Sequence, residues 1–146
     1  MASYIILKTQ KTQTMEASLC DDGIVRVLFK KDSEMDVEDV KQNYKVFSDL
    51  VDGKYYSFLY SPENNAVSYT DEALTYAKDA ANTAFPKICI AVVVKTLAQK
   101  LLTNFYIKFF NKPSYRKTFN NYNEAEEWCK NLYKEYQRTP KKLILF

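Results

Sequence analysis

Apolar and polar residues alternate near the start of the chain, and this pattern predicts a β-hairpin. The alternation over residues 14–19 is typical of a half-buried strand. Asp22 and Gly23 follow as a turn signal, because glycine readily takes the positive φ that tight hairpin turns require. The alternation resumes over residues 24–30, which predicts the returning strand.

Further along, apolar residues recur at the spacing of three and four that marks one face of a helix. This spacing predicts helices over residues 36–51, from Thr70 through an alanine-rich stretch, over 96–110 and over 120–137. Strand-like runs lie between them, over residues 55–60, 88–94 and 116–119, and residues 66–69 are expected to extend the first run briefly. In the helix over 96–110, we expect the core face to consist of Leu97, Leu101, Leu102, Phe105 and Phe109.

Residues 88–94 form a continuous apolar run, rich in β-branched side chains, which predicts a central strand covered on both faces. The whole order of elements is ββαβαβαβα. Alternation after the first hairpin favours right-handed crossovers, and therefore an α/β fold with a mostly parallel sheet and one antiparallel edge. We expect one domain over residues 1–146, with an extra strand at 4–9 and an apolar tail at 141–146.

Composition excludes several kinds of chemistry. With two glycines, the 146-residue chain has no dinucleotide fingerprint and no glycine-rich phosphate loop. It has no histidine, so neither a Ser-His or Cys-His pair nor a histidine-containing metal site can form, and we expect no metal and no other cofactor. An enzyme that uses tyrosine, lysine or carboxylate side chains is a distant alternative. The three cysteines, which are far apart in the sequence, favour buried reduced thiols and a cytoplasmic location. No apolar run reaches the roughly 18 residues of a membrane helix.

Charge is unevenly distributed along the chain. Residues 95–146 carry 11 Lys or Arg against four Glu, although the net charge of the whole chain is only +3. Within residues 105–117, basic side chains alternate with aromatic ones, a combination that suits an anionic lipid head group or, less well, single-stranded nucleic acid. A solvated basic rim over ordinary core aromatics explains the same pattern. The candidate binding residues are Lys108, Asn111, Lys112, Tyr115, Arg116 and Lys117.

Ser68 and Thr70 are candidate phosphoacceptors, because a phosphate is favoured by the free N–H groups at a helix N-terminus. The alternative is that Thr70 only caps the helix that follows. Asp71 and Glu72 come directly after it and would repel a phosphate.

Several short motifs follow one another in a characteristic order. They read Asp22-Gly23, Ser68-Tyr69-Thr70-Asp71-Glu72-Ala73, Asn104-Phe105, Asn111-Lys112-Pro113, Phe119 and Glu124-Ala125-Glu126-Glu127-Trp128. With the leading hairpin, this order resembles the STAS/SpoIIAA-like fold of anti-sigma-factor antagonists. Residues 14–137 are more closely similar to a family of small, uncharacterised bacterial STAS-like proteins.

The resemblance implies a non-enzymatic regulatory or protein-interaction module with a protein partner. In anti-sigma-factor antagonists, a phosphorylatable serine lies in an Asp-Ser-Ser-Gly sequence before the second helix; here residues 67–71 read Val-Ser-Tyr-Thr-Asp, so that pattern is missing. The apolar ends at residues 4–7 and 143–146 are expected either to be buried within the fold or to form a homodimer contact.

Overall fold

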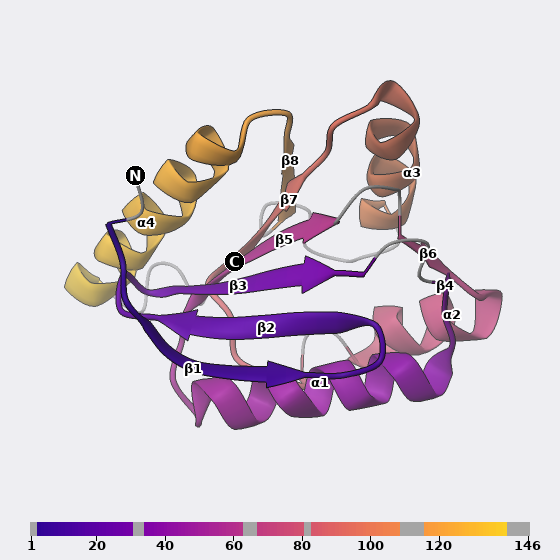
Figure 1. Cartoon of the computed structure of the whole chain (residues 1–146), viewed down its shortest axis with the longest axis horizontal. Coiled ribbons are helices and arrows are strands. Elements are labelled where there is room, and N and C mark those ends of the chain that lie inside the picture. Colours follow the sequence, from indigo (N-terminus) through magenta and orange to yellow (C-terminus); the bar gives the residue numbers. More distant parts are fainter. Residues whose placement is uncertain (1–2, 31–33, 63–66, 81–82, 109–115, 140–146) are drawn as a thin grey trace.

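The chain folds into a mixed α/β structure in which one six-stranded sheet lies between helices (Figure 1). The computed structural model describes residues 3–30, 34–62, 67–80, 83–108 and 116–139. The strands of this sheet are β1 (Ile6–Lys11), β2 (Met15–Cys20), β3 (Ile24–Phe29), β5 (Ser57–Pro62), β7 (Cys89–Val93) and β8 (Arg116–Phe119). The helices are α1 (Val37–Val51), α2 (Asp71–Ala80), α3 (Leu97–Ile107) and α4 (Tyr122–Arg138).

The sheet has the order β1-β2-β3-β5-β7-β8. The first three strands pair antiparallel, and β3, β5, β7 and β8 pair parallel. The predicted strand over residues 88–94 is confirmed as β7, which lies between β5 and β8. Its residues Ile90 and Ala91 point to opposite faces of the sheet and are both buried. The α/β class and the antiparallel edge are therefore as the sequence predicts.

Helices cover the two faces of the sheet with two separate cores (Figure 1). The α1 core is built from α1, α2 and one face of β2, β3, β5 and β7, and the rings of Phe47, Phe58 and Phe85 pack against one another in it. The α4 core lies on the opposite face. Its buried members are Ile24, Leu59, Ile88, Cys89, Ala91, Val93, Ala125 and Cys129.

A second, two-stranded sheet lies beside the main one. It pairs β4 (Glu34–Met35) with β6 (Ser68–Tyr69) in parallel. The expectation that residues 66–69 extend the strand over 55–60 is therefore wrong for Ser68 and Tyr69, because their backbone groups bond to the segment that precedes α1.

The predicted core face of α3 is wrong for three of its five residues. Leu97, Leu101 and Phe105 are 71%, 62% and 52% exposed. The helix buries Gln99 instead, whose side chain also closes a capping box with Thr96 at the start of the helix. Leu102 is half-buried, and Phe109 lies outside the described residues.

The N-terminal strand joins the sheet as its edge. It spans Ile6–Lys11 rather than residues 4–9 and pairs with β2. The side chains of Ile5, Ile6 and Leu7 are more than half exposed, so the expected burial of residues 4–7 within the fold is wrong for these three. The tail over 141–146 lies outside the described residues. Among the described helices, none combines the length and the apolar character needed to cross a bilayer.

Gly23 and Gly53 both have a backbone conformation that favours glycine, but only Gly23 is also packed closely against another residue. Substituting each of them therefore tests how α4 packs on the hairpin. Both have positive φ, +84° and +78°. A Cβ at Gly23 would lie 2.2 Å from the Tyr133 ring of α4, whereas one at Gly53 would meet no described atom within 4 Å.

We predict that Gly53→Ala lowers the free energy of unfolding by about 1–2 kcal/mol through backbone strain alone. Gly23→Ala should cost about 1–3 kcal/mol more, because the Tyr133 ring must move. Urea denaturation of both variants measures the difference, and the double variant Gly23→Ala/Tyr133→Ala should recover most of it. Equal losses in the two single variants would contradict the close packing.

Candidate functional site

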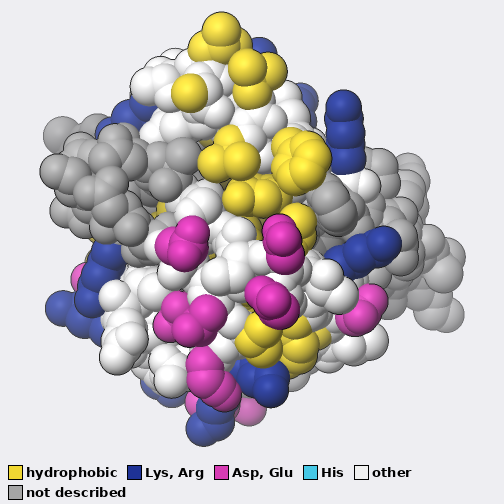
Figure 2. Space-filling view, turned by 90° about the vertical axis from the view of Figure 1, so that its right-hand side faces the viewer, with side chains coloured by type: hydrophobic (Ala, Val, Ile, Leu, Met, Phe, Trp, Pro, Cys, Tyr) yellow, Lys and Arg dark blue, Asp and Glu magenta, His cyan; other side chains and the backbone are white. Residues whose placement is uncertain are grey.

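A cavity of about 110 Å³ lies between α1, α3, the short sheet and the main sheet. Phe29, Tyr60 and Val93 bring the carboxyl-terminal halves of β3, β5 and β7 to it, which is where open α/β sheets bind ligands. Figure 2 shows hydrophobic side chains gathered at this end of the molecule, with acidic side chains beside them. The lining consists of Phe29, Met35, Val40, Asn43, Tyr44, Phe47, Tyr60, Val67, Tyr69, Phe85, Ile90, Val92, Val93, Val94, Gln99, Thr103, Tyr106, Ile107 and Arg116.

Arg116 reaches the cavity because of the register of the edge strand β8. It pairs with Ile90 of β7, which belongs to the α1 core, so both side chains point to the α1 side. Arg116 is 8% exposed. Lys117 is the next residue along β8 and points to the other face, where its Nζ lies 5.2 Å from the centroid of the Phe119 ring.

The segment over residues 105–117 is therefore not one basic surface. Arg116 is buried, whereas Lys117 and Lys108 are exposed, and Lys108 lies at the C-terminal end of α3. The candidates Asn111, Lys112 and Tyr115 lie outside the described residues. Alternation along a strand separates neighbouring basic residues onto opposite faces, which a count of charges cannot reveal.

Around Arg116, the cavity wall supplies tyrosine hydroxyl groups. Burial lowers the pKa of the Arg116 guanidinium, and the nearby Tyr60, Tyr44 and Tyr69 act in the opposite direction. Burial also raises the pKa of all three tyrosines, that of Tyr69 to about 12. These hydroxyls therefore stay protonated at neutral pH and can donate hydrogen bonds.

Lys87 lies beside Phe85, a residue of the cavity wall. Burial and then the charge of Arg116 lower the pKa of the Lys87 ammonium to about 7. The Lys87 Nζ lies 4.3 Å from the ring centroid of Phe85, which lines the cavity, and donates a hydrogen bond to the Phe85 carbonyl oxygen at 3.2 Å. Lys87 therefore lies next to the cavity wall, whereas Arg116 is part of it.

Other polar groups around the cavity hold the fold together. The Asn43 side chain accepts a hydrogen bond from the Thr12 hydroxyl at 2.7 Å, and its amide donates to the Thr14 hydroxyl at 3.0 Å. The Tyr106 hydroxyl accepts a hydrogen bond from the backbone N–H of Tyr69 at 3.2 Å. These contacts join α1 to the β1–β2 turn, and α3 to the short sheet.

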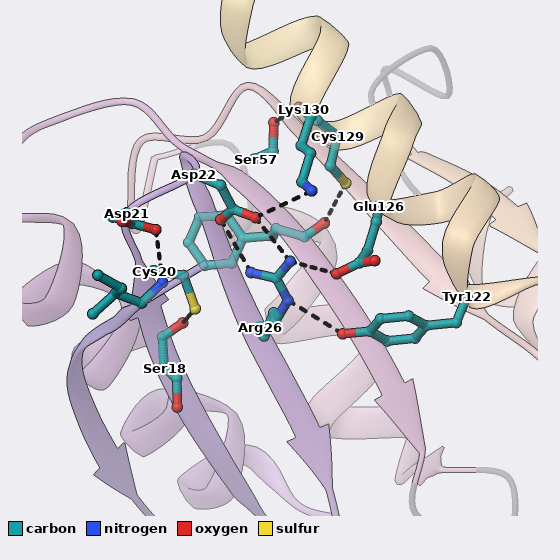
Figure 3. A network of polar contacts seen from close by, with 12 residues as sticks. Ser18, Cys20, Asp21, Asp22, Arg26, Ser57, Tyr122, Glu126, Cys129 and Lys130 are labelled. Atoms are coloured by element: carbon teal, nitrogen blue, oxygen red, sulfur yellow. Dashed lines mark hydrogen bonds and ion pairs between the residues drawn. The ribbon is translucent and has the colours of Figure 1, made fainter. Parts of the chain in front are cut away.

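A separate ionic cluster ties the first hairpin to α4 (Figure 3). The Arg26 guanidinium donates to Asp22 at 2.9 Å and to Glu126 at 2.5 Å, and its Nε donates to the Tyr122 hydroxyl at 3.3 Å. Burial alone would lower the pKa of Arg26, but the hydrogen bonds to Asp22 and Glu126 raise it above its ordinary value. Because both carboxylates are bound to Arg26, we interpret this cluster as a structural clamp.

The sequence analysis does not predict the Arg26 cluster, although the strand that contains Arg26 carries a signal for a buried ion pair. Arg26 lies in β3 between Val25 and Val27, which are both buried. A charged side chain in such a strand indicates an oppositely charged partner on the face of the sheet to which it points. That partner, Glu126, lies 100 residues away from Arg26 in the sequence, so no local pattern identifies it.

The phosphoacceptor candidates occupy structural positions. Ser68 is half-buried in β6, opposite Glu34 of β4. The Thr70 hydroxyl oxygen accepts a hydrogen bond from the Ala73 backbone N–H at 3.1 Å, which is the contact of a helix cap. The cysteines, Cys20, Cys89 and Cys129, are buried free thiols, as the sequence predicts.

Comparison with known proteins gives one match. Residues 18–133 match a family described as a domain of unknown function (DUF7793). The matched region begins in β2 and ends in α4, and includes both the cavity and the Arg26 cluster. No curated protein and no solved structure matches the chain.

We predict that Arg26→Met lowers the free energy of unfolding by about 3–5 kcal/mol, because Asp22 and Glu126 lose their counter-charge in a largely buried setting. Denaturant unfolding measures the loss. The triple variant Arg26→Met/Asp22→Asn/Glu126→Gln should regain part of it. As a matched control, Lys11→Met breaks an exposed pair with Glu16 and should cost less than about 1 kcal/mol; a similar loss in both would contradict the clamp.

Proposed function

The chain belongs to the DUF7793 family, and from this premise and its geometry we propose that it is a non-enzymatic binding module. The module takes a small, largely apolar molecule into the cavity between α1 and α3. The observation that carries this proposal is an apolar space at the carboxyl ends of parallel strands, walled by aromatic rings.

The size of the cavity limits what can enter it. Its volume is about 110 Å³. An engineered cavity of about 150 Å³ binds benzene, so the part of a ligand that is buried here is about the size of one ring. A whole nucleotide or a long acyl chain is too large to be enclosed.

A regulatory role of STAS-like type is part of the same proposal. What supports it is the parallel series β3, β5, β7 and β8, whose strands adjoin in chain order with helices between them. A cytoplasmic setting is supported by the three buried free thiols, which persist in a reducing compartment. In this proposal the module reports the presence of its ligand and performs no reaction on it.

A substitution that fills the cavity tests whether the cavity binds a ligand. Thr103→Phe places a ring in the space from α3, and Lys100→Phe, on the exposed side of the same helix, is the matched control. We expect phenol, benzyl alcohol or benzoate at millimolar concentration to shift the methyl NMR signals of Val40, Val92 and Ile107 in the wild type and in Lys100→Phe. Thr103→Phe should abolish those shifts. Unchanged spectra with all three compounds would contradict the proposal.

The exposed face of α3 favours a second function, the pairing of two copies of the chain. Leu97, Leu101 and Phe105 are spaced four residues apart and form one apolar stripe. Stripes of this spacing are the ridges by which two helices pack together. Because α3 also lines the cavity through Thr103 and Tyr106, ligand binding and pairing would involve the same helix.

We predict a dimer that dissociates on dilution in sedimentation velocity experiments. Leu101→Lys should shift the equilibrium to the monomer, because it places a charge in the middle of the stripe. Lys100→Ala, beside it on the same helix, should leave the equilibrium unchanged. A monomeric wild type over the micromolar to millimolar range would refute this pairing.

A further inference from the structure

We propose that the ligand of the cavity is an uncharged ring compound with one oxygen substituent, a hydroxyl or a carbonyl group, and that the hydroxyls of Tyr44, Tyr60 and Tyr69 bind this oxygen. The three tyrosines come from α1, β5 and β6, and all of them line the cavity. This inference rests on the proposed function and names the chemical class of its ligand.

The wall of the cavity favours a ring over a flexible chain. The ring centroids of Phe29 and Tyr60 lie 5.2 Å apart at an interplanar angle of 85°, and those of Tyr44 and Phe85 lie 5.3 Å apart at 60°. Aromatic pairs prefer such inclined arrangements, so a ligand ring can pack against these side chains in the same way. A ring also loses less conformational entropy on binding than an alkyl chain of equal volume.

The accessible surface of the three tyrosines belongs to the cavity. Each side chain is half-buried and lines the cavity, so part of its surface is open. Burial is nevertheless the main reason that the pKa of each hydroxyl is raised, which means that protein and not bulk water surrounds these groups. Open surface with little bulk water around it is what a side chain on a cavity wall has. The protonated hydroxyls are therefore available to a molecule inside the cavity.

The three hydroxyls lie near one another. After burial, Tyr44 and Tyr69 contribute most to the raised pKa of Tyr60, and Tyr69 contributes to that of Tyr44. Within the described part of the chain, none of these hydroxyls has a hydrogen-bond partner; the contact of Tyr69 with the Tyr106 hydroxyl uses the backbone N–H of Tyr69. A hydroxyl that is buried without a hydrogen bond costs free energy. A ligand oxygen that bonds to these groups is therefore favoured over a plain hydrocarbon ring.

A neutral oxygen suits these hydroxyls better than an ion does. A tyrosine hydroxyl both donates and accepts, so it can bind a ligand hydroxyl in either direction and can donate to a ligand carbonyl. Moving an ionised group from water into a largely apolar space costs far more free energy than moving a neutral oxygen. The volume of about 110 Å³ limits the buried part of the ligand to about one ring with its substituent.

Packing holds two of the tyrosine rings in place before a ligand binds. The Tyr60 ring stacks on Phe47, with centroids 6.0 Å apart and an interplanar angle of 28°. The Tyr69 ring meets the Tyr106 ring edge-on, at 5.0 Å and 88°, and the backbone hydrogen bond between the same two residues adds a second restraint. Groups that the fold has already positioned lose little further freedom on binding, which favours selectivity for one substituent.

The experiment compares three compounds with the same number of non-hydrogen atoms at pH 7. Phenol and cyclohexanone carry one oxygen on a six-membered ring, whereas toluene carries a methyl group in its place. Titrations followed by the methyl NMR signals of Val40, Val92 and Ile107 give the three affinities. We expect phenol, cyclohexanone or both to bind about 3–10 times more tightly than toluene, the factor that one hydrogen bond contributes. Which of the two is preferred distinguishes a ligand hydroxyl from a ligand carbonyl.

Tyrosine-to-phenylalanine variants remove the hydroxyls and keep the rings. The triple variant Tyr44→Phe/Tyr60→Phe/Tyr69→Phe should abolish the preference over toluene and leave the affinity for toluene unchanged. Loss of affinity for all three compounds would instead indicate that the hydroxyls only maintain the fold. Tyr76→Phe is the matched control, because Tyr76 packs against the same α1 core but does not line the cavity. It should keep the preference.

The outcomes separate the two proposals. Toluene binding as tightly as phenol and cyclohexanone, or a preference that the triple variant retains, would overturn this inference and leave the apolar cavity as a binding site. Benzoate binding more tightly than phenol would overturn the assignment of an uncharged ligand. Absence of binding by all these compounds would overturn the proposed function and this inference together.

Discussion

Burial of β5 and β7 on both faces is the constraint on which the rest of the structure depends. A strand buried on two faces must present apolar side chains to both, so Phe58 and Ile90 point to the α1 core while Leu59 and Ala91 point to the α4 core. Helices must then cover each face. Among the described helices, α4 covers one face, whereas α1, α2 and α3 lie on the other, and residues of both α1 and α3 line the cavity.

The sequence predicts well those features that a single element determines. The apolar run of β7 and the inner face of α4, with Ala125 and Cys129 buried, follow from composition and period alone. The face of α3 does not, because apolar residues occur almost all the way around that helix. The side of α3 that is buried carries Gln99, a polar residue that apolar spacing does not select.

The sequence predicts the residues of the candidate site only in part, because the site depends on the register in which β8 pairs with β7. The sequence presents Arg116 as one cation of a segment, residues 105–117, that is expected to form a basic surface. Its burial follows from pairing with Ile90 in β7, and no local pattern specifies that partner. Contacts between distant parts of the chain make the site.

The two buried arginines lie on different strands of the sheet and have different surroundings. Arg26 has counter-charges supplied by the chain, from Asp22 on the hairpin and Glu126 on α4, so its charge is compensated when the fold forms. Arg116 lies on the edge strand β8 and points to the α1 side of the sheet, where it lines the cavity together with Tyr44, Tyr60 and Tyr69. The register of a strand therefore decides whether a buried arginine becomes part of the link between the hairpin and α4 or part of the cavity wall.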